Sequence, residues 1–187
     1  MLTGYVLMRI TVPKSQMPKT SARAVPAQVM PGLNAQMTMT ALTHGKAQVQ
    51  MQGSSVAILA FGAPLHDCID IAGSIDATLV NMRFVKPLDA ELICSLAASH
   101  ELLVTVEENA VSGGAGSGVN ELLMAAGIAC NVLNIGIPDR FIEHGARDDC
   151  LADAGLDKRS IARQIHERMQ AMGLAIGVKT GVARGGS

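Results

Sequence analysis

Short apolar segments recur along the chain from residue 56 onward and have the length of buried β-strands. Their apolar residues follow one another without alternation, which is typical of strands that are covered on both faces. Before them, residues 46–52 alternate polar and apolar side chains, and this pattern predicts a strand at the edge of a sheet with one face in water. The four apolar segments are Val56–Phe61, Thr78–Met82, Leu102–Val106 and Asn131–Ile135.

Apolar residues at helical spacing separate and follow these strands. Asp89 is placed to cap the second helix, Gly127 to end the third, and Asp157 to begin the last. The four stripes are Leu65, Cys68, Ile69 and Ala72; Leu88, Leu92, Ile93 and Leu96; Val119, Leu122, Leu123 and Ala126; and Ile161, Ile165, Met169 and Met172. This alternation predicts an α/β fold, a three-layer sandwich with helices on both faces of a five-stranded, mostly parallel sheet and one antiparallel edge strand.

The same patterns divide the chain into three regions. Residues 1–41 are expected to be an irregular or disordered leader, because four prolines interrupt every candidate element. Residues 42–172 carry the strands and helices and should form one domain. Residues 173–187 are rich in glycine and are expected to be a flexible tail.

Composition and charge exclude several classes of function. The 187 residues carry a net charge of −1 and are 2% aromatic, so both the positive field and the stacking platforms of nucleic-acid-binding proteins are missing. No apolar run approaches the ~20 residues that cross a bilayer, and no secretory signal stands at the N-terminus. We therefore expect a cytoplasmic protein. The four scattered cysteines should be reduced, mostly buried thiols, and the scattered histidines argue against a zinc site.

The segment LLVTVEENAVSGGAGSGVNELL, at residues 102–123, invites a functional interpretation. A strand, a glycine-rich turn and a helix follow one another as in a phosphate-binding loop. However, the GxGxxG pattern fails at Val119, and the carboxylates of Glu107 and Glu108 would repel a phosphate. The structural alternative is that the glycines allow a tight turn and a close approach of the helix start to the sheet. A third alternative is that the free N–H groups of the helix start, with Glu107, Glu108 and Asn109, contact another domain or subunit.

Other charged side chains have two interpretations each. Arg83 would reach into an interdomain cleft or form an ordinary ion pair at the end of a strand. Glu107 and Glu108 point to opposite faces of a strand, so solvated or interface carboxylates are expected instead of an acid–base pair. His144 would line a pocket or make a structural hydrogen bond. Asp139–Arg140 is expected to be a local ion pair that contributes ~0–1 kcal/mol.

Several blocks of sequence resemble the C-terminal domain of the 1-deoxy-D-xylulose-5-phosphate synthases, which are thiamine-diphosphate enzymes of the transketolase superfamily. The similarity covers residues 42 to 170 and keeps the order and spacing of the blocks. It implies the fold that the strand and helix pattern predicts. The blocks are GKAQVQMQGSSVAILAFG, VNMRFVKPLD, ASHELLVTVEENAVSGGAGSGVNELL, VLNIGIPDRFIEHG and LADAGLD.

The resemblance also implies a reaction, the condensation of pyruvate with glyceraldehyde 3-phosphate with release of carbon dioxide. Its product feeds isoprenoid, thiamine and pyridoxal synthesis, and the full-length enzymes use thiamine diphosphate and Mg²⁺. The Gly-Asp-Gly motif and the Tyr-Pro-Arg-Gly segment of the family's other two domains do not occur in these 187 residues. We therefore expect this chain alone to bind neither thiamine diphosphate nor Mg²⁺, to carry no catalytic, cofactor-binding or metal-ligating residue, and to be inactive.

What remains for such a chain is domain docking and support of a dimer. The expected partners are the missing N-terminal and central synthase domains, which a separate polypeptide could supply, or a second copy of the chain. A different class of function is a stand-alone regulatory module that binds a small anion or a partner chain. The expected interdomain or interface contacts are Arg83, Glu107, Glu108, Asn109 and His144.

Overall fold

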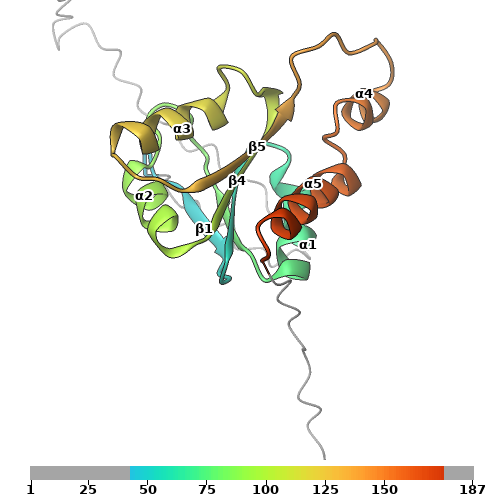
Figure 1. The fold of residues 1–187 in the computed structure, drawn as a ribbon. Helices are drawn as coiled ribbons and strands as arrows, with labels where there is room; N and C mark the ends of the chain where they lie inside the picture. Colours follow the sequence, from blue (N-terminus) through green and yellow to red (C-terminus); the bar gives the residue numbers. More distant parts are fainter. Residues whose placement is uncertain (1–42, 175–187) are drawn as a thin grey trace, which may run out of the picture. The chain divides into compact units, whose positions relative to one another are not determined.

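The computed structural model describes residues 43–174, which form a five-stranded sheet between two layers of helices (Figure 1). The strands are β1 (Gln48–Met51), β2 (Val56–Phe61), β3 (Thr78–Asn81), β4 (Leu102–Ala110) and β5 (Asn131–Ile137). The helices are α1 (Leu65–Ile75), α2 (Ala90–Ser99), α3 (Ala115–Ala125), α4 (Arg147–Asp153) and α5 (Lys158–Ala171). The expected leader at 1–41 and most of the expected tail at 173–187 lie outside the described residues.

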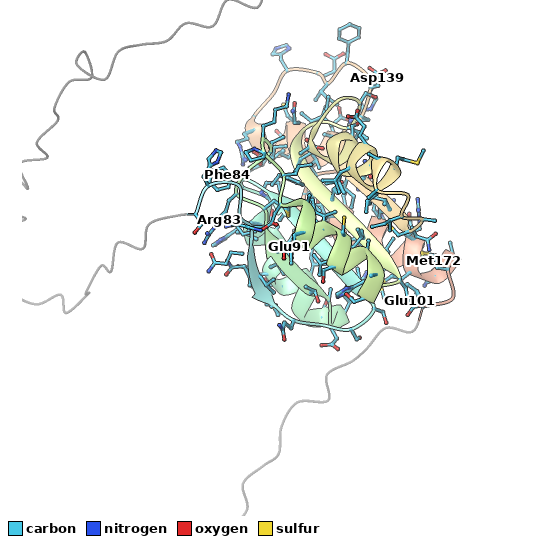
Figure 2. The ribbon with its side chains drawn as sticks, turned by 90° about the vertical axis from the view of Figure 1, so that its left-hand side faces the viewer. Arg83, Phe84, Glu91, Glu101, Asp139 and Met172 are labelled. Atoms are coloured by element: carbon cyan, nitrogen blue, oxygen red, sulfur yellow. The ribbon has the colours of Figure 1, made fainter. Side chains whose placement is uncertain are left out.

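The sheet has the strand order β1-β3-β2-β4-β5. β1 pairs antiparallel with β3, and the other three pairs are parallel. The expected edge strand and mostly parallel sheet are therefore confirmed. The carboxyl ends of β2, β3, β4 and β5 all lie at one end of the sheet. Figure 2 shows Asp139, which follows β5, at one end of the domain and Glu101, which precedes β4, at the other.

Both faces of the sheet are covered, which explains why the buried strands do not alternate in polarity. Ile58 packs in the cluster with α1 and α5, whereas its neighbours Ala57 and Leu59 pack in the cluster with α2 and α3. Figure 1 shows α1 and α5 on one side of the sheet and α2 and α3 on the other. The three-layer prediction is confirmed.

The helix ends follow the expected chemistry. The carboxylate of Asp89 accepts a hydrogen bond from the backbone N–H of Leu92 at the start of α2. Asp157 caps α5 in the same way through the N–H groups of Arg159 and Ser160. Gly127 has a φ of 67°, the left-handed conformation that glycine tolerates just beyond a helix.

Two helical predictions need correction. Ile69 was expected in the apolar stripe of α1, but it is 43% exposed, and Ile71 and Ile75 are buried in its place. Helix α4 was not predicted at all. It has no buried residue, so it carries no apolar stripe that the sequence pattern would reveal.

Asp89 also joins α2 to the segment that leads into β1. Its carboxylate accepts hydrogen bonds from the backbone N–H of Ala47, at 3.1 Å, and from the Lys46 ammonium, at 3.2 Å. Burial by itself would raise the pKa of Asp89, but the bonds from Ala47, Lys46 and Leu92 together lower it below its ordinary value. The ionised form is therefore favoured by folding, and its stabilisation is present at neutral pH and is lost as pH falls through the lowered pKa.

We predict that Asp89→Ala lowers the free energy of unfolding by about 1–3 kcal/mol at neutral pH, because it removes a helix cap and leaves the N–H of Ala47 without its acceptor. The matched control is Glu91→Gln, which removes only the exposed partner of Lys46 and should change stability by less than ~1 kcal/mol. Urea unfolding at neutral and acidic pH measures both effects. The loss for Asp89→Ala should shrink in acid, and equal losses for the two variants would contradict the capping role.

Candidate functional site

A cleft of about 880 Å³ opens at the carboxyl ends of β2, β3 and β4. Its walls are the residues after β2, the loop from Arg83 to Leu88, the end of β4 and the start of α3. The helix after β2 covers one face of the sheet and the helix after β4 covers the other. Open α/β sheets bind ligands in the crevice that such a switch of faces creates. This cleft is thus the place where the fold favours a binding site.

Glu107 lines this cleft and is only 3% exposed. Its Oε2 accepts a hydrogen bond of 2.7 Å from the N–H of Ala115, and its Oε1 accepts one of 2.8 Å from the N–H of Gly116. These N–H groups belong to the first turn of α3, the positive end of the helix dipole. Of the two alternatives for Glu107, the solvated carboxylate is therefore wrong, and a contact with another domain stays a prediction. The N–H groups of Ala115 and Gly116 are not free, because the carboxylate occupies the place where a phosphate would bind.

Glu108 and Asn109 complete this wall of the cleft and have different partners. The Glu108 carboxylate forms an ion pair with Arg147 at the start of α4. Asn109 is exposed, and its side-chain oxygen accepts a hydrogen bond from the N–H of Ala110. The two neighbouring carboxylates thus fasten two different helices, α3 and α4, to the end of β4.

Arg83 lies on the opposite wall, in a left-handed backbone conformation with a φ of 57°. Its guanidinium donates a hydrogen bond to the side-chain oxygen of Gln48 on β1, so its partner here is an amide and not the carboxylate that an ordinary ion pair would need. Figure 2 shows Arg83 and Phe84 at the rim of the domain. The cleft therefore brings together four of the five expected contact residues, namely Arg83, Glu107, Glu108 and Asn109.

His144 is the fifth expected contact and lies elsewhere. It is exposed and lines a separate cavity of about 340 Å³ between the loop after β5 and α4. In the same loop, the expected ion pair between Asp139 and Arg140 is wrong. The Arg140 guanidinium instead reaches Asp153 at the end of α4, with contacts of 2.9 and 3.1 Å to its two carboxylate oxygens. This hydrogen-bonded pair lowers the pKa of Asp153.

Close packing requires two glycines of the turn, at positions 114 and 116, in agreement with the structural interpretation. A Cβ atom on Gly114 would lie 2.2 Å from the carbonyl oxygen of Ala110. A Cβ atom on Gly116 would lie 2.5 Å from the Thr105 hydroxyl. Both distances are far inside van der Waals contact, so only glycine lets the start of α3 come close enough for Glu107 to cap it.

Ser117 also shapes the turn, and this role was not predicted from the sequence. Its hydroxyl donates a 2.7 Å hydrogen bond to the carbonyl of Val111 and accepts one of 3.0 Å from the N–H of Gly113. A hydroxyl can fill both roles at once. The available signal was a serine inside a glycine-rich turn, where such side chains often bond to the backbone.

Two features of the described segment bear on the binding of a metal ion or a diphosphate. Among residues 43–174, no group of three His, Cys, Asp or Glu side chains is placed to hold a metal ion. The helix start in the cleft does not fit a diphosphate, because Glu107 already accepts its N–H groups. Burial raises the pKa of the Cys68 thiol to about 12, so it is no nucleophile at neutral pH. The other three cysteines are only partly buried, and all four are free thiols.

Within the part of the chain that is described, no helix is both long and apolar enough to cross a membrane.

Comparison with known proteins identifies the family of the chain. The model of the family "Transketolase, C-terminal domain" matches residues 45–161. The chain belongs to this family.

The relatives of the chain confirm its resemblance to the synthases. It is 49% identical over 154 residues to 1-deoxy-D-xylulose-5-phosphate synthase of Chromobacterium violaceum, a match that covers 82% of this chain and 25% of the relative. It is 55% identical over 132 residues to the synthase of Shewanella sediminis, covering 71% of this chain and 21% of the relative. The transketolase C-terminal domain thus spans about a quarter or less of the length of these relatives.

A solved structure agrees with the fold of this transketolase C-terminal domain. A chain of the "Split gene transketolase, inactive beta4 tetramer" superposes with a TM-score of 0.63 and is 28% identical. The match covers 69% of this chain and 44% of that one. The fold class and the resemblance that the sequence indicated are therefore both confirmed.

We predict that Glu107→Gln lowers the free energy of unfolding by about 1–3 kcal/mol, because a neutral amide replaces the charged acceptor of two helix N–H groups. Glu108→Gln, the adjacent control, loses only an exposed ion pair and should cost less than ~1 kcal/mol. Chemical denaturation of the two variants measures the difference. Equal stability of Glu107→Gln and the wild type would refute the importance of the buried cap.

A second pair of variants tests the close approach of α3. Gly116→Ala should destabilise the protein by about 1–3 kcal/mol, because the added Cβ meets Thr105 and Asn134. Gly118→Ala, two residues further along the helix, places its Cβ at an ordinary 3.5 Å from Leu88 and should be neutral or stabilising by about 0.5–1 kcal/mol. Thermal unfolding distinguishes the two, and a stable Gly116→Ala protein would show that the packing is loose.

Proposed function

We propose that this chain is the C-terminal module of a 1-deoxy-D-xylulose-5-phosphate synthase and that its role is domain docking and support of a dimer. The observation that carries this proposal is the match of most of the chain to about a quarter or less of several synthases. The activity of those enzymes, in the synthesis of isoprenoid and thiamine precursors in the cytoplasm, then belongs to an assembly larger than this chain.

The chemistry of the cleft supports a non-catalytic role for the isolated module. A thiamine enzyme must hold the diphosphate and its metal and must place a proton-relaying group against the cofactor. Here Glu107 accepts the hydrogen bonds of the N–H groups at the start of α3, and Glu108 and Glu121 also line the cleft. These carboxylates disfavour a polyanion. We therefore propose that thiamine diphosphate and Mg²⁺ bind the other domains and not this chain alone.

The proposed partners are of two kinds. One is the set of missing domains, which a separate polypeptide could carry, and the other is a second copy of the chain. The related solved structure is that of a split-gene transketolase in the form of an inactive β4 tetramer. That protein is a precedent for transketolase-like domains distributed over separate chains, and it supports self-association of this chain as part of its function.

A second candidate function is the stand-alone module that captures a small anion. The observation in its favour is that Arg83 and Lys86 line one wall of the cleft. Isothermal titration calorimetry with inorganic phosphate and with thiamine diphosphate distinguishes the two functions. We expect no measurable heat of binding for either, and a clear affinity for one of them would favour the regulatory module.

We predict that the purified chain makes no 1-deoxy-D-xylulose 5-phosphate from pyruvate and glyceraldehyde 3-phosphate in the presence of thiamine diphosphate and Mg²⁺. The physical reason is that its residues orient neither the cofactor nor the substrates. The chain must be produced in a host strain free of its own synthase, with the Chromobacterium violaceum enzyme as the positive control. Turnover above the blank would overturn the proposed function.

A further inference from the structure

The cleft at the carboxyl ends of the strands is lined by side chains of both charges that have no partner in the described domain. Lys86 belongs to the loop after β3 and Glu121 to α3, and both are exposed and line the cleft. Among residues 43–174, the ion pairs involve neither of them. An ammonium and a carboxylate thus face one cleft without pairing with each other.

Arg83 adds a second cation to the wall that carries Lys86. Its guanidinium has five N–H donors, and its partner in the described domain is the neutral side-chain oxygen of Gln48. The backbone at Arg83 is left-handed, and the N–H of Phe84 donates a 2.5 Å hydrogen bond to the carbonyl of Met82 across it. Strained backbone of this kind gathers at sites that hold ligands. The turn therefore points to a binding role for this wall.

The walls of the cleft are fixed by contacts within the described domain. Glu107 holds the start of α3, Glu108 pairs with Arg147 of α4, and Arg83 is bound to Gln48 of β1. The volume of about 880 Å³ falls in the range of roughly 300–1,000 Å³ that small-molecule sites occupy. Such sites lie preferentially at domain interfaces, so a neighbouring domain that covers this edge would close over a ligand.

Apolar side chains line the cleft between these charges. They come from the end of β2, the loop after β3 and α3, and they offer an apolar ligand body a surface away from water. The apolar lining residues are Phe61, Val85, Pro87, Leu88 and Leu122.

We propose that this cleft binds a small zwitterion, in which an apolar body carries one carboxylate and one primary ammonium, as in a free amino acid. The carboxylate of the ligand accepts hydrogen bonds from Arg83 and Lys86, and its ammonium donates to Glu121. Each charge of the ligand then meets a group of opposite charge, which offsets its loss of water. This inference goes beyond the proposed module role and does not depend on it.

Ligands with a single kind of charge fit the same cleft less well. A phosphate would meet the two cations but would be repelled by Glu108 and Glu121. The N–H groups at the start of α3 do not compensate this repulsion, because Glu107 already accepts their hydrogen bonds. A simple amine would pair with Glu121 and leave Arg83 and Lys86 unmatched. A ligand that carries both charges is the one that the cleft favours.

Isothermal titration calorimetry of the full chain tests the site. The probes are L-leucine and 6-aminohexanoate, which differ in the distance between their two charges. We expect at least one of them to bind with a dissociation constant of about 1 mM or lower. The controls keep the apolar body but only one charge, namely 4-methylpentanoate and 3-methylbutylamine for leucine, and hexanoate and pentylamine for 6-aminohexanoate. Each should bind at least about tenfold more weakly than its zwitterion.

Two variants connect this binding to the cleft. Glu121→Gln and Lys86→Gln should each weaken the binding of the zwitterion at least about tenfold. Glu121→Gln should leave the weak binding of the carboxylate control unchanged. Glu143→Gln is the matched control, because Glu143 is exposed, lies outside the cleft and undergoes the same change of charge. It should bind like the wild type, and circular dichroism checks that each variant is folded.

The possible results separate this inference from the proposed function. A wild-type chain that binds neither zwitterion, or a folded Glu121→Gln variant with unchanged affinity, refutes the zwitterion site and leaves the module role intact. Inorganic phosphate or a single-charge control that binds as tightly as the zwitterion also refutes it. A chain that turns over substrate refutes the module role, whereas the calorimetry still reports whether the cleft holds a zwitterion.

Discussion

The carboxylate of Glu107 joins the buried strand β4 to the first turn of α3, and the rest of the cleft depends on this contact. A buried negative charge is tolerated there because two N–H groups and the positive end of a helix dipole surround it. The contact needs the helix start to lie almost against the strand. The glycines at 114 and 116 make that approach possible, since any side chain would collide with β4 or its neighbours. Chain conformation and electrostatics thus depend on each other at this point.

This internal cap changes how the cleft behaves. In many α/β proteins a helix start at the switch point of the sheet receives a phosphate group. Here the carboxylate of Glu107 takes the position of that phosphate, so the N–H groups at the start of α3 are already hydrogen-bonded within the protein. Glu108 extends the arrangement by holding the start of α4 through Arg147. Two neighbouring carboxylates on one strand therefore organise the loops around the cleft.

Membership in the transketolase C-terminal domain family places the chain beside enzymes that are several times longer than it is. The chain corresponds to only a part of each synthase that it resembles. Its carboxyl-end surface carries a charged cleft on one side, and on the other it carries an apolar cavity beside an exposed aromatic ring. The cleft joins cationic side chains, Arg83 and Lys86, to the carboxylates of Glu108 and Glu121.

The sequence by itself determined the layers of the fold, because buried strands and helical stripes such as Ile161–Ile165–Met169 are periodic, and periodicity is local information. It also determined the caps at Asp89 and Asp157, whose partners lie a few residues away. Only the tertiary structure decided the partners of Glu107, Arg83 and Arg140, which depend on how turns and distant elements approach. Helix α4 and the cavity beside it stayed hidden for the same reason, since α4 buries no residue. A side chain's partner across space depends on the whole packed chain, and no local pattern records it.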